Sequence, residues 1–183
     1  MKILLFGVSC VGKSTVGQIL AQKLDYKFYD LDDEIVKCLK MSLEKFVSSG
    51  NLHWRDKQRS NVIKEIVKKD EDMVFALSPI SYYENFKKWV NADGIVLIEL
   101  YDSAENIFSR LVFSDENDNI YVDDEYKNKR RNYYLRDINS DLEWYGQVNK
   151  KIGVKNRIFV NNDKPEVVAD RIMEIIDKNC NLN

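Results

Sequence analysis

One nine-residue segment near the start of the chain, Gly7–Thr15, restricts the possible folds more than any other feature. It reads GVSCVGKST and fits the phosphate-cradling pattern G-x-x-x-x-G-K-[ST] directly after an apolar run at residues 3–6. In this pattern the glycines allow a tight turn, backbone N–H groups converge on a phosphate, and the next helix directs the positive end of its dipole there. We therefore predict a nucleotide site in which Lys13 contacts the β and γ phosphates and the Ser14 hydroxyl ligates Mg²⁺.

Four other residues of this segment belong to the predicted nucleotide site: Gly7, Cys10, Gly12 and Thr15. Cys10 lies inside the loop, where it is either a small residue that the turn tolerates or a redox-active thiol.

Length and composition predict one folded domain over residues 1–183. With 28 basic and 30 acidic residues the net charge is −2, so the chain lacks the electrostatic footprint of a nucleic-acid or membrane-surface binder. The apolar run after Met1 is too short for a signal peptide, and no stretch approaches the length of a membrane span. Three cysteines at unrelated spacings favour reduced thiols. We therefore expect a cytoplasmic protein that is a monomer or a weak homodimer, with no nucleic-acid or membrane partner.

Strand and helix patterns alternate along the whole chain. Strands are expected at residues 3–6, 26–29, 73–77, 94–100 and 157–160, and helices at 13–24, 33–49 with a break near 41–42, 55–69, 83–91, 103–111, 126–148 and 163–176. Residues 112–125 are acidic and have little periodicity, so we expect an exposed excursion there. The alternation predicts a three-layer α/β fold, in which helices flank a parallel sheet of about five strands and the ligand crevice lies at the carboxyl ends of the strands.

Two aspartates, Asp30 and Asp32, end the second predicted strand. If the strand continues, their side chains point the same way, toward the phosphate loop. Asp32 is then placed to orient the hydroxyl group of an acceptor or to hold Mg²⁺ through water, with Asp30 in support. The alternative is a helix amino-terminal cap, because Asp32 or Asp33 precedes an amphipathic run that begins at Glu34. The two roles are compatible.

Several further segments follow the order of motifs of one family. They are Thr15-Val16-Gly17, residues 20–24 (LAQKL), residues 28–32 (FYDLD), residues 42–46 (SLEKF), Gly50 and Trp54-Arg55. In this order they resemble the shikimate kinases and their relatives among the small P-loop kinases. The resemblance implies a P-loop kinase fold with acceptor-binding helices at about 33–69 and a lid at about 112–126. It also implies transfer of the γ-phosphoryl group from MgATP to a hydroxyl group of a small anionic acceptor.

The resemblance also suggests roles for single residues. Asp32 is expected to contact the acceptor hydroxyl, and Arg55 to hold the carboxylate of the acceptor, for which a bidentate guanidinium is well suited. Without the resemblance, Arg55 reads as a surface ion-pair residue. Arg110 and Asn161 are expected on the nucleotide side, since the tripeptide Asn161-Asn162-Asp163 follows the last strand where relatives wrap the adenine. Without the resemblance, this tripeptide reads as a turn and a helix cap.

The chain departs from the family in three places, all on the acceptor and lid side. The third strand leads into residues 78–80 (SPI) where the family has a glycine-rich turn, so the acceptor pocket differs in shape or in ligand. The segment after Arg110 is acidic, whereas the family's lid carries an arginine over the transferring phosphate. The late arginine that grips the acceptor matches only loosely to Arg130 or Arg131.

A basic cluster offers one compensation for the lost lid arginine: Lys127, Lys129, Arg130, Arg131 and Arg136. Its residues either clamp the phosphates when their helix closes on the site or form a solvated face that balances the acidic excursion.

These residues together predict a magnesium- and ATP-dependent kinase of the shikimate kinase type with an altered acceptor pocket. Two alternatives stay open. One is a kinase for a different small acceptor, such as a nucleotide, a sugar acid or an antibiotic. The other is a module that binds ATP without transferring phosphate.

Overall fold

The computed structural model describes residues 1–77, 87–90 and 92–180. Residues 78–80, where the sequence departs from the family pattern, lie outside the described residues. So do residues 83–86 and 91 of the helix expected at 83–91.

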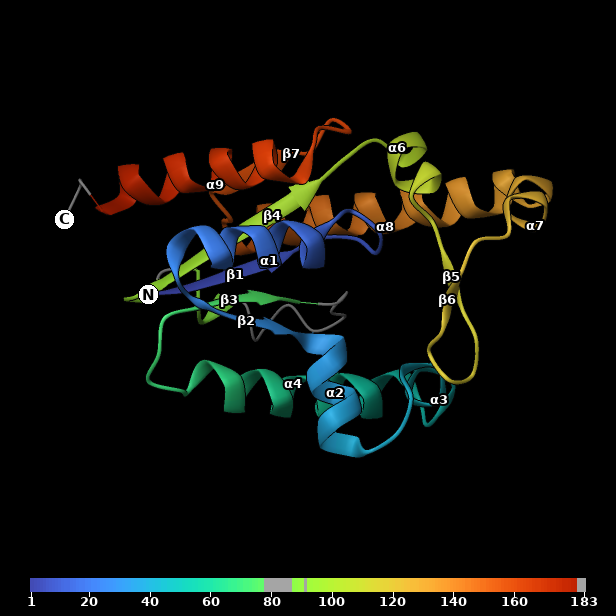
Figure 1. Cartoon of the computed structure of the whole chain (residues 1–183), viewed down its shortest axis with the longest axis horizontal. Coiled ribbons are helices and arrows are strands. Elements are labelled where there is room, and N and C mark those ends of the chain that lie inside the picture. Colours follow the sequence, from blue (N-terminus) through green and yellow to red (C-terminus); the bar gives the residue numbers. More distant parts are fainter. Residues whose placement is uncertain (78–86, 91, 181–183) are drawn as a thin grey trace.

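In the described part of the chain, five parallel strands form the central sheet, in the order β2-β3-β1-β4-β7 (Figure 1). Strand β1 lies in the middle, with Lys2 opposite Met73 of β3 on one side and opposite Ile95 of β4 on the other. Nearly every residue of β1 and β3 is buried and apolar, as expected for strands that are covered on both faces. The predicted α/β fold is confirmed.

The elements of the sheet and its surrounding helices follow each other in this order: β1 Lys2–Phe6, α1 Lys13–Leu24, β2 Lys27–Asp30, α2 Leu31–Leu39, α3 Leu43–Ser48, α4 Leu52–Val67, β3 Met73–Ala76, β4 Ile95–Tyr101, α6 Ala104–Ser109, β5 Phe113–Ser114, β6 Ile120–Tyr121, α7 Asp124–Lys129, α8 Arg131–Ile152, β7 Asn156–Phe159 and α9 Pro165–Cys180.

Helices cover both faces of the sheet. Gly17 of α1 approaches so closely that an added Cβ would lie 2.7 Å from the Phe28 ring and 3.4 Å from Leu5. The next residue of the strand, Phe6, instead contacts the ring of Tyr145 in α8, with centroids 6.2 Å apart. Because successive strand side chains point to opposite faces, α1 and α8 lie on opposite sides of the sheet. Helix α9 packs beside α1 (Figure 1). Among the helices that the structure describes, none is long and apolar enough to cross a membrane.

Three segments differ from the sequence-based expectation. The acidic excursion contains a two-stranded antiparallel hairpin, β5–β6, in which Phe113 pairs with Tyr121. The helix expected at 126–148 is two helices, α7 and α8, because the backbone leaves the helical region at Arg130 (φ −111°, ψ 17°). Helix α2 begins at Leu31, two residues earlier than expected, because the Asp30 side chain caps it.

The first turn after β1 packs against the backbone of β4. Gly7 has φ +143°, and a Cβ there would lie 2.1 Å from the carbonyl oxygen of Leu100. A side chain is therefore excluded both by backbone conformation and by space.

We expect Gly7→Ala to lower the free energy of unfolding by about 2 kcal/mol or more, because it adds a steric overlap and a strained φ. Urea unfolding measures the change. Gly146→Ala in α8 is the matched control: an added Cβ there meets nothing within 4 Å. Since alanine favours a helix interior, this control should be neutral or slightly stabilising. Equal destabilisation by both substitutions would contradict the role given to Gly7.

Candidate active site

A cavity of about 610 Å³ opens at the carboxyl edge of the sheet. Its walls come from the phosphate loop, the end of β2 with the start of α2, the end of β3, and the hairpin β5–β6. The described lining residues are Ser9, Cys10, Gly12, Lys13, Ser14, Thr15, Asp30, Asp32, Asp33, Val36, Leu43, Ala76, Leu77, Arg110, Val112, Phe113, Ser114, Asp118 and Ile120. The cavity thus brings together most of the predicted loop residues with Asp32 and Arg110.

Lys13 begins α1, and its side chain folds back over the phosphate loop. Its Nζ donates hydrogen bonds to the carbonyl oxygens of Gly7 (3.0 Å) and Val8 (2.9 Å). Burial lowers the pKa of the Lys13 ammonium, although the nearby carboxylates of Asp32 and Asp30 act in the opposite direction. The loop therefore holds a cation in a partly desolvated place, where a polyphosphate would be a better partner than two carbonyl groups.

The Ser14 hydroxyl lies against the end of β2. It donates a 2.5 Å hydrogen bond to Asp30 Oδ2, while Asp30 Oδ1 accepts from the backbone N–H of Asp32 at 3.0 Å. Asp30 therefore caps α2, so the cap considered for Asp32 or Asp33 is provided by the residue at the end of β2 instead. Asp32 lies in the first turn of that helix and not on an extended strand. Both carboxylates still line the cavity.

The oxygens of Ser14, Asp30 and Asp32 suit Mg²⁺, which prefers hard oxygen ligands and keeps several of its waters. Among residues 1–77, 87–90 and 92–180, no group of three or more His, Cys, Asp or Glu side chains forms a metal site.

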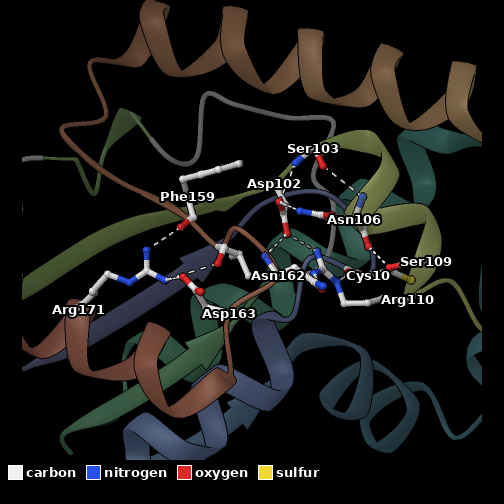
Figure 2. Close-up of polar contacts among 11 residues, drawn as sticks. Cys10, Asp102, Ser103, Asn106, Ser109, Arg110, Phe159, Asn162, Asp163 and Arg171 are labelled. Atoms are coloured by element: carbon white, nitrogen blue, oxygen red, sulfur yellow. Dashed lines mark hydrogen bonds and ion pairs between the residues drawn. The ribbon is translucent and has the colours of Figure 1, made fainter.

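Arg110 follows α6 and reaches back to the phosphate loop. Figure 2 shows its guanidinium between the loop at Cys10, the buried Asp102 and the turn at Asn162. Arg110 also belongs to the lining of the cavity.

The hairpin forms the wall of the cavity opposite α2. At its tip, Asp118 accepts hydrogen bonds from the backbone N–H groups of Leu43 (2.7 Å) and Glu44 (3.0 Å) at the start of α3. Asp115 holds the tip itself by accepting from Asn117 and Asn119. These bonds outweigh burial and lower the pKa of the Asp115 carboxyl. The acidic excursion thus closes the cavity by binding the α2–α3 segment with a carboxylate.

Five predicted site residues lie outside the described lining of the cavity: Gly7, Arg55, Arg130, Arg131 and Asn161. Arg55 Nη1 donates to the carbonyl oxygens at residues 47 (2.7 Å) and 49 (3.3 Å), at the end of α3. The Arg130 guanidinium covers the ring of Tyr126, and Arg131 forms an ion pair with Glu105. Asn161 adopts a left-handed conformation, and it is the neighbouring Asn162 whose side chain accepts a hydrogen bond from Arg110.

Residue patterns missed two contributors to the site: Asp102 and Asp118. Asp102 directly follows the clearest predicted strand, so the reasoning applied to Asp30 and Asp32 at the end of β2 would have found it. No comparable signal marks Asp118, because its partners are backbone N–H groups distant in sequence.

Comparison with known proteins agrees with this arrangement. The family model described as shikimate kinase matches residues 9–177. The chain belongs to the shikimate kinase family. The predicted resemblance is confirmed, and it makes the chain an ATP-dependent phosphotransferase whose acceptor group is an alcohol.

The relatives described next align with nearly the whole length of this chain. A shikimate kinase of Caldicellulosiruptor bescii is 27% identical over 177 residues, 94% of each chain. A crystal structure of shikimate kinase from Bacteroides thetaiotaomicron has a TM-score of 0.75 at 20% identity and covers 97% of this chain and 98% of its own. Shikimate kinase from Acinetobacter baumannii, solved in complex with shikimate, has a TM-score of 0.72 at 21% identity, with 97% and 93% covered. At these identities the two structures support the fold alone.

We expect Asp118→Asn to loosen the contact between the hairpin and α3. The carboxamide keeps one acceptor oxygen, so at least one of the two amides, Leu43 or Glu44, loses its charged partner. Hydrogen exchange of that amide, followed by NMR, should accelerate on the order of tenfold, since a bond to a charged group contributes about 1.5 kcal/mol. Glu116→Gln, a charge removal in the same loop, should leave both rates unchanged. Unchanged exchange in Asp118→Asn would show that the contact does not persist in solution.

We also expect ATP binding to take up a proton at alkaline pH. The pKa of Lys13 in the free protein is below its ordinary 10.5, and the negative charge of the phosphates raises it again on binding. Between the two values the complex holds more protons than the free protein, so affinity falls as pH rises. Calorimetry at pH 9–10 in buffers of different ionisation enthalpy counts the protons. Lys13→Arg, which stays charged, should abolish the uptake, and its persistence in that variant would assign it elsewhere.

Proposed function

We propose that this kinase uses MgATP to phosphorylate a hydroxyl group of a small anionic acceptor of the shikimate type, within an acceptor pocket that differs from that of its relatives. One observation carries the proposal: Lys13 and Ser14 of the phosphate loop share a single cavity with Asp30 and Asp32. Phosphoryl transfer needs two kinds of group: cations, which neutralise the phosphates, and carboxylates, which position the attacking oxygen.

The start of α1 and the two aspartates at the end of β2 have the following proposed roles. The backbone N–H groups at the start of α1 and the Lys13 ammonium bind the β and γ phosphates. Ser14 and Asp32 hold Mg²⁺, with Asp30 orienting the Ser14 hydroxyl through the 2.5 Å bond between them. When bound, Mg²⁺ neutralises charge on the phosphate oxygens. Asp32 also orients the acceptor hydroxyl for attack.

The acceptor side of the proposal rests on Arg55 and on Arg130 or Arg131. Arg55 can bind an acid group after giving up the carbonyl oxygens that it now contacts at the end of α3. Arg130 and Arg131 would have to leave Tyr126 and Glu105. The cavity lining itself holds the carboxylates of Asp33 and Asp118 on that side, which supports a pocket altered from the family pattern. Burial, followed by the negative charge of Asp30, raises the pKa of the Asp33 carboxyl.

We further propose a cytoplasmic protein that acts as a monomer or weak homodimer without a nucleic-acid partner. The free thiols of Cys10 and Cys38 and the net charge of −2 support this assignment.

The proposal is tested by measuring ADP production with MgATP and a panel of acceptors: shikimate, gluconate, a nucleoside monophosphate and an aminoglycoside. We expect turnover with shikimate or another acid acceptor. Lys13→Ala should lower that turnover on the order of 10²–10³-fold, because it removes a charge that stabilises the transferring group.

Lys23→Ala is the matched control, because Lys23 lies in the same helix and pairs with Asp170 outside the cavity. It should retain wild-type turnover. Tight MgATP binding without turnover across the panel would replace the proposal with a non-catalytic ATP-binding module. Turnover with the nucleotide or the antibiotic alone would keep the chemistry and reject the anionic shikimate-type acceptor.

A further inference from the structure

Two buried carboxylates occupy the end of β4 and the residue that follows it. Glu99 is 2% exposed and pairs with Arg157 of β7, while Asp102 is 3% exposed and pairs with Arg110 at 2.8 Å. The two pairs resemble each other in burial and in chemistry. Only the second one reaches the active-site cavity, because Arg110 lines it.

Each of the two carboxylate oxygens of Asp102 accepts two hydrogen bonds. Its Oδ1 accepts from the backbone N–H of Ser103 and from Asn106 Nδ2, both at 2.8 Å. Its Oδ2 accepts from Arg110 Nη2 at 2.8 Å and from the backbone N–H of Asn162 at 3.3 Å. Burial raises the pKa of the Asp102 carboxyl, but these hydrogen bonds outweigh burial and hold the pKa below its ordinary 3.8. The group is therefore a fixed anion at neutral pH.

Arg110 is held at all three of its nitrogens. Besides the bond from Nη2 to Asp102, Nε donates to the Cys10 carbonyl at 3.1 Å and Nη1 to Asn162 Oδ1 at 3.2 Å (Figure 2). A guanidinium that is neutralised by Asp102 and bonded on every side serves as a rigid planar surface more than as a free cation.

The two backbone segments that this pair joins are both left-handed turns. Cys10 has φ +59° and Asn162 has φ +56°, conformations that residues other than glycine seldom adopt. The Cys10 turn has other supports, since Lys13 Nζ bonds the carbonyl oxygens of Gly7 and Val8. In the second turn, the backbone N–H of Asn162 donates to Asp102, and the side-chain oxygen of Asn162 accepts from Arg110.

The sheet order separates the two ends of the cavity. The phosphate loop follows the central strand β1. Asp30 and Asp32 follow β2 at one edge, whereas Asp102 follows β4 and Asn162 follows β7 toward the other edge. With the phosphates over β1 and the acceptor beside Asp32, the nucleoside of ATP has the β4–β7 side left to occupy.

We propose that Asp102 is a positioning residue for the nucleoside part of ATP, because it holds Arg110 and the Asn162 turn in place as the wall of that end of the cavity. It acts through these neighbours and touches no reacting atom. The inference rests on the nucleotide site of the proposed function and adds to it the residue that holds the nucleoside end of that site in place.

The test compares Asp102→Asn with Glu99→Gln, each of which neutralises one buried carboxylate beside an arginine. Equilibrium binding is measured with ATP and with inorganic tripolyphosphate, which has the phosphates without a nucleoside. In Asp102→Asn the dissociation constant for ATP should rise about tenfold or more, while that for tripolyphosphate stays within about twofold. Glu99→Gln should leave both constants unchanged. With an active acceptor, Asp102→Asn should raise the KM for ATP and retain kcat.

Three results would overturn the inference: unchanged ATP affinity in Asp102→Asn, an equal loss for tripolyphosphate, or the same loss in Glu99→Gln. If Asp102→Asn does not fold, Asn106→Ala removes one donor to Asp102 and leaves its charge and its other bonds. This variant should show the same selective loss at about threefold, and an absence of selectivity in it would also overturn the inference.

The binding measurement separates this inference from the proposed function. Wild-type protein that binds ATP but phosphorylates no acceptor rejects the proposed function and leaves the role of Asp102 intact. Wild-type protein that binds tripolyphosphate no more weakly than ATP has no nucleoside wall, and this result rejects the inference while the kinase chemistry stands.

Discussion

The close approach of Gly7 to the backbone of β4 is the constraint on which the rest of the site depends. With no side chain at Gly7, the loop can turn directly above Leu100 and place α1 so that its first residues face the cavity. The same contact fixes the distance between the loop and the residues that follow β4. Arg110 can therefore span from the Cys10 carbonyl to Asp102 with hydrogen bonds of ordinary length. One tight turn thus sets the geometry of both the proposed phosphate site and the proposed nucleoside wall.

Much of the fold could be predicted from the sequence, since its strands are nearly continuous apolar runs. Strands β1 and β3 are buried on both faces, which leaves little choice of residue type. The phosphate loop was equally predictable, because its glycines and Lys13 act through backbone geometry that recurs wherever a helix start binds phosphate. The apolar strands and the phosphate loop are each specified by residues that are close together in the sequence, and such patterns can be recognised without a structure.

The remaining features depend on contacts between distant residues. Helix periodicity continues through Arg130, so the break between α7 and α8 left no mark in the pattern. The β5–β6 strands are two residues each and carry no alternation to detect. Arg55 matches its family position, yet in this structure it contacts carbonyl oxygens at the end of α3, a choice of partner that depends on how the α3–α4 connection is folded. The identity of Asp102 as a buried anion required knowledge of its four donors.

The packing of Gly17 against Phe28 and Leu5 has a mechanical consequence. A helix this close to the strands beneath it has no room to slide or tilt, so α1 and the loop before it form a rigid part of the cavity wall. Adaptation to a substrate must then come from elements that rest on fewer neighbours, such as the hairpin. The proposed phosphate site is then preformed, so the entropic cost of ordering it is met during folding, before any substrate arrives.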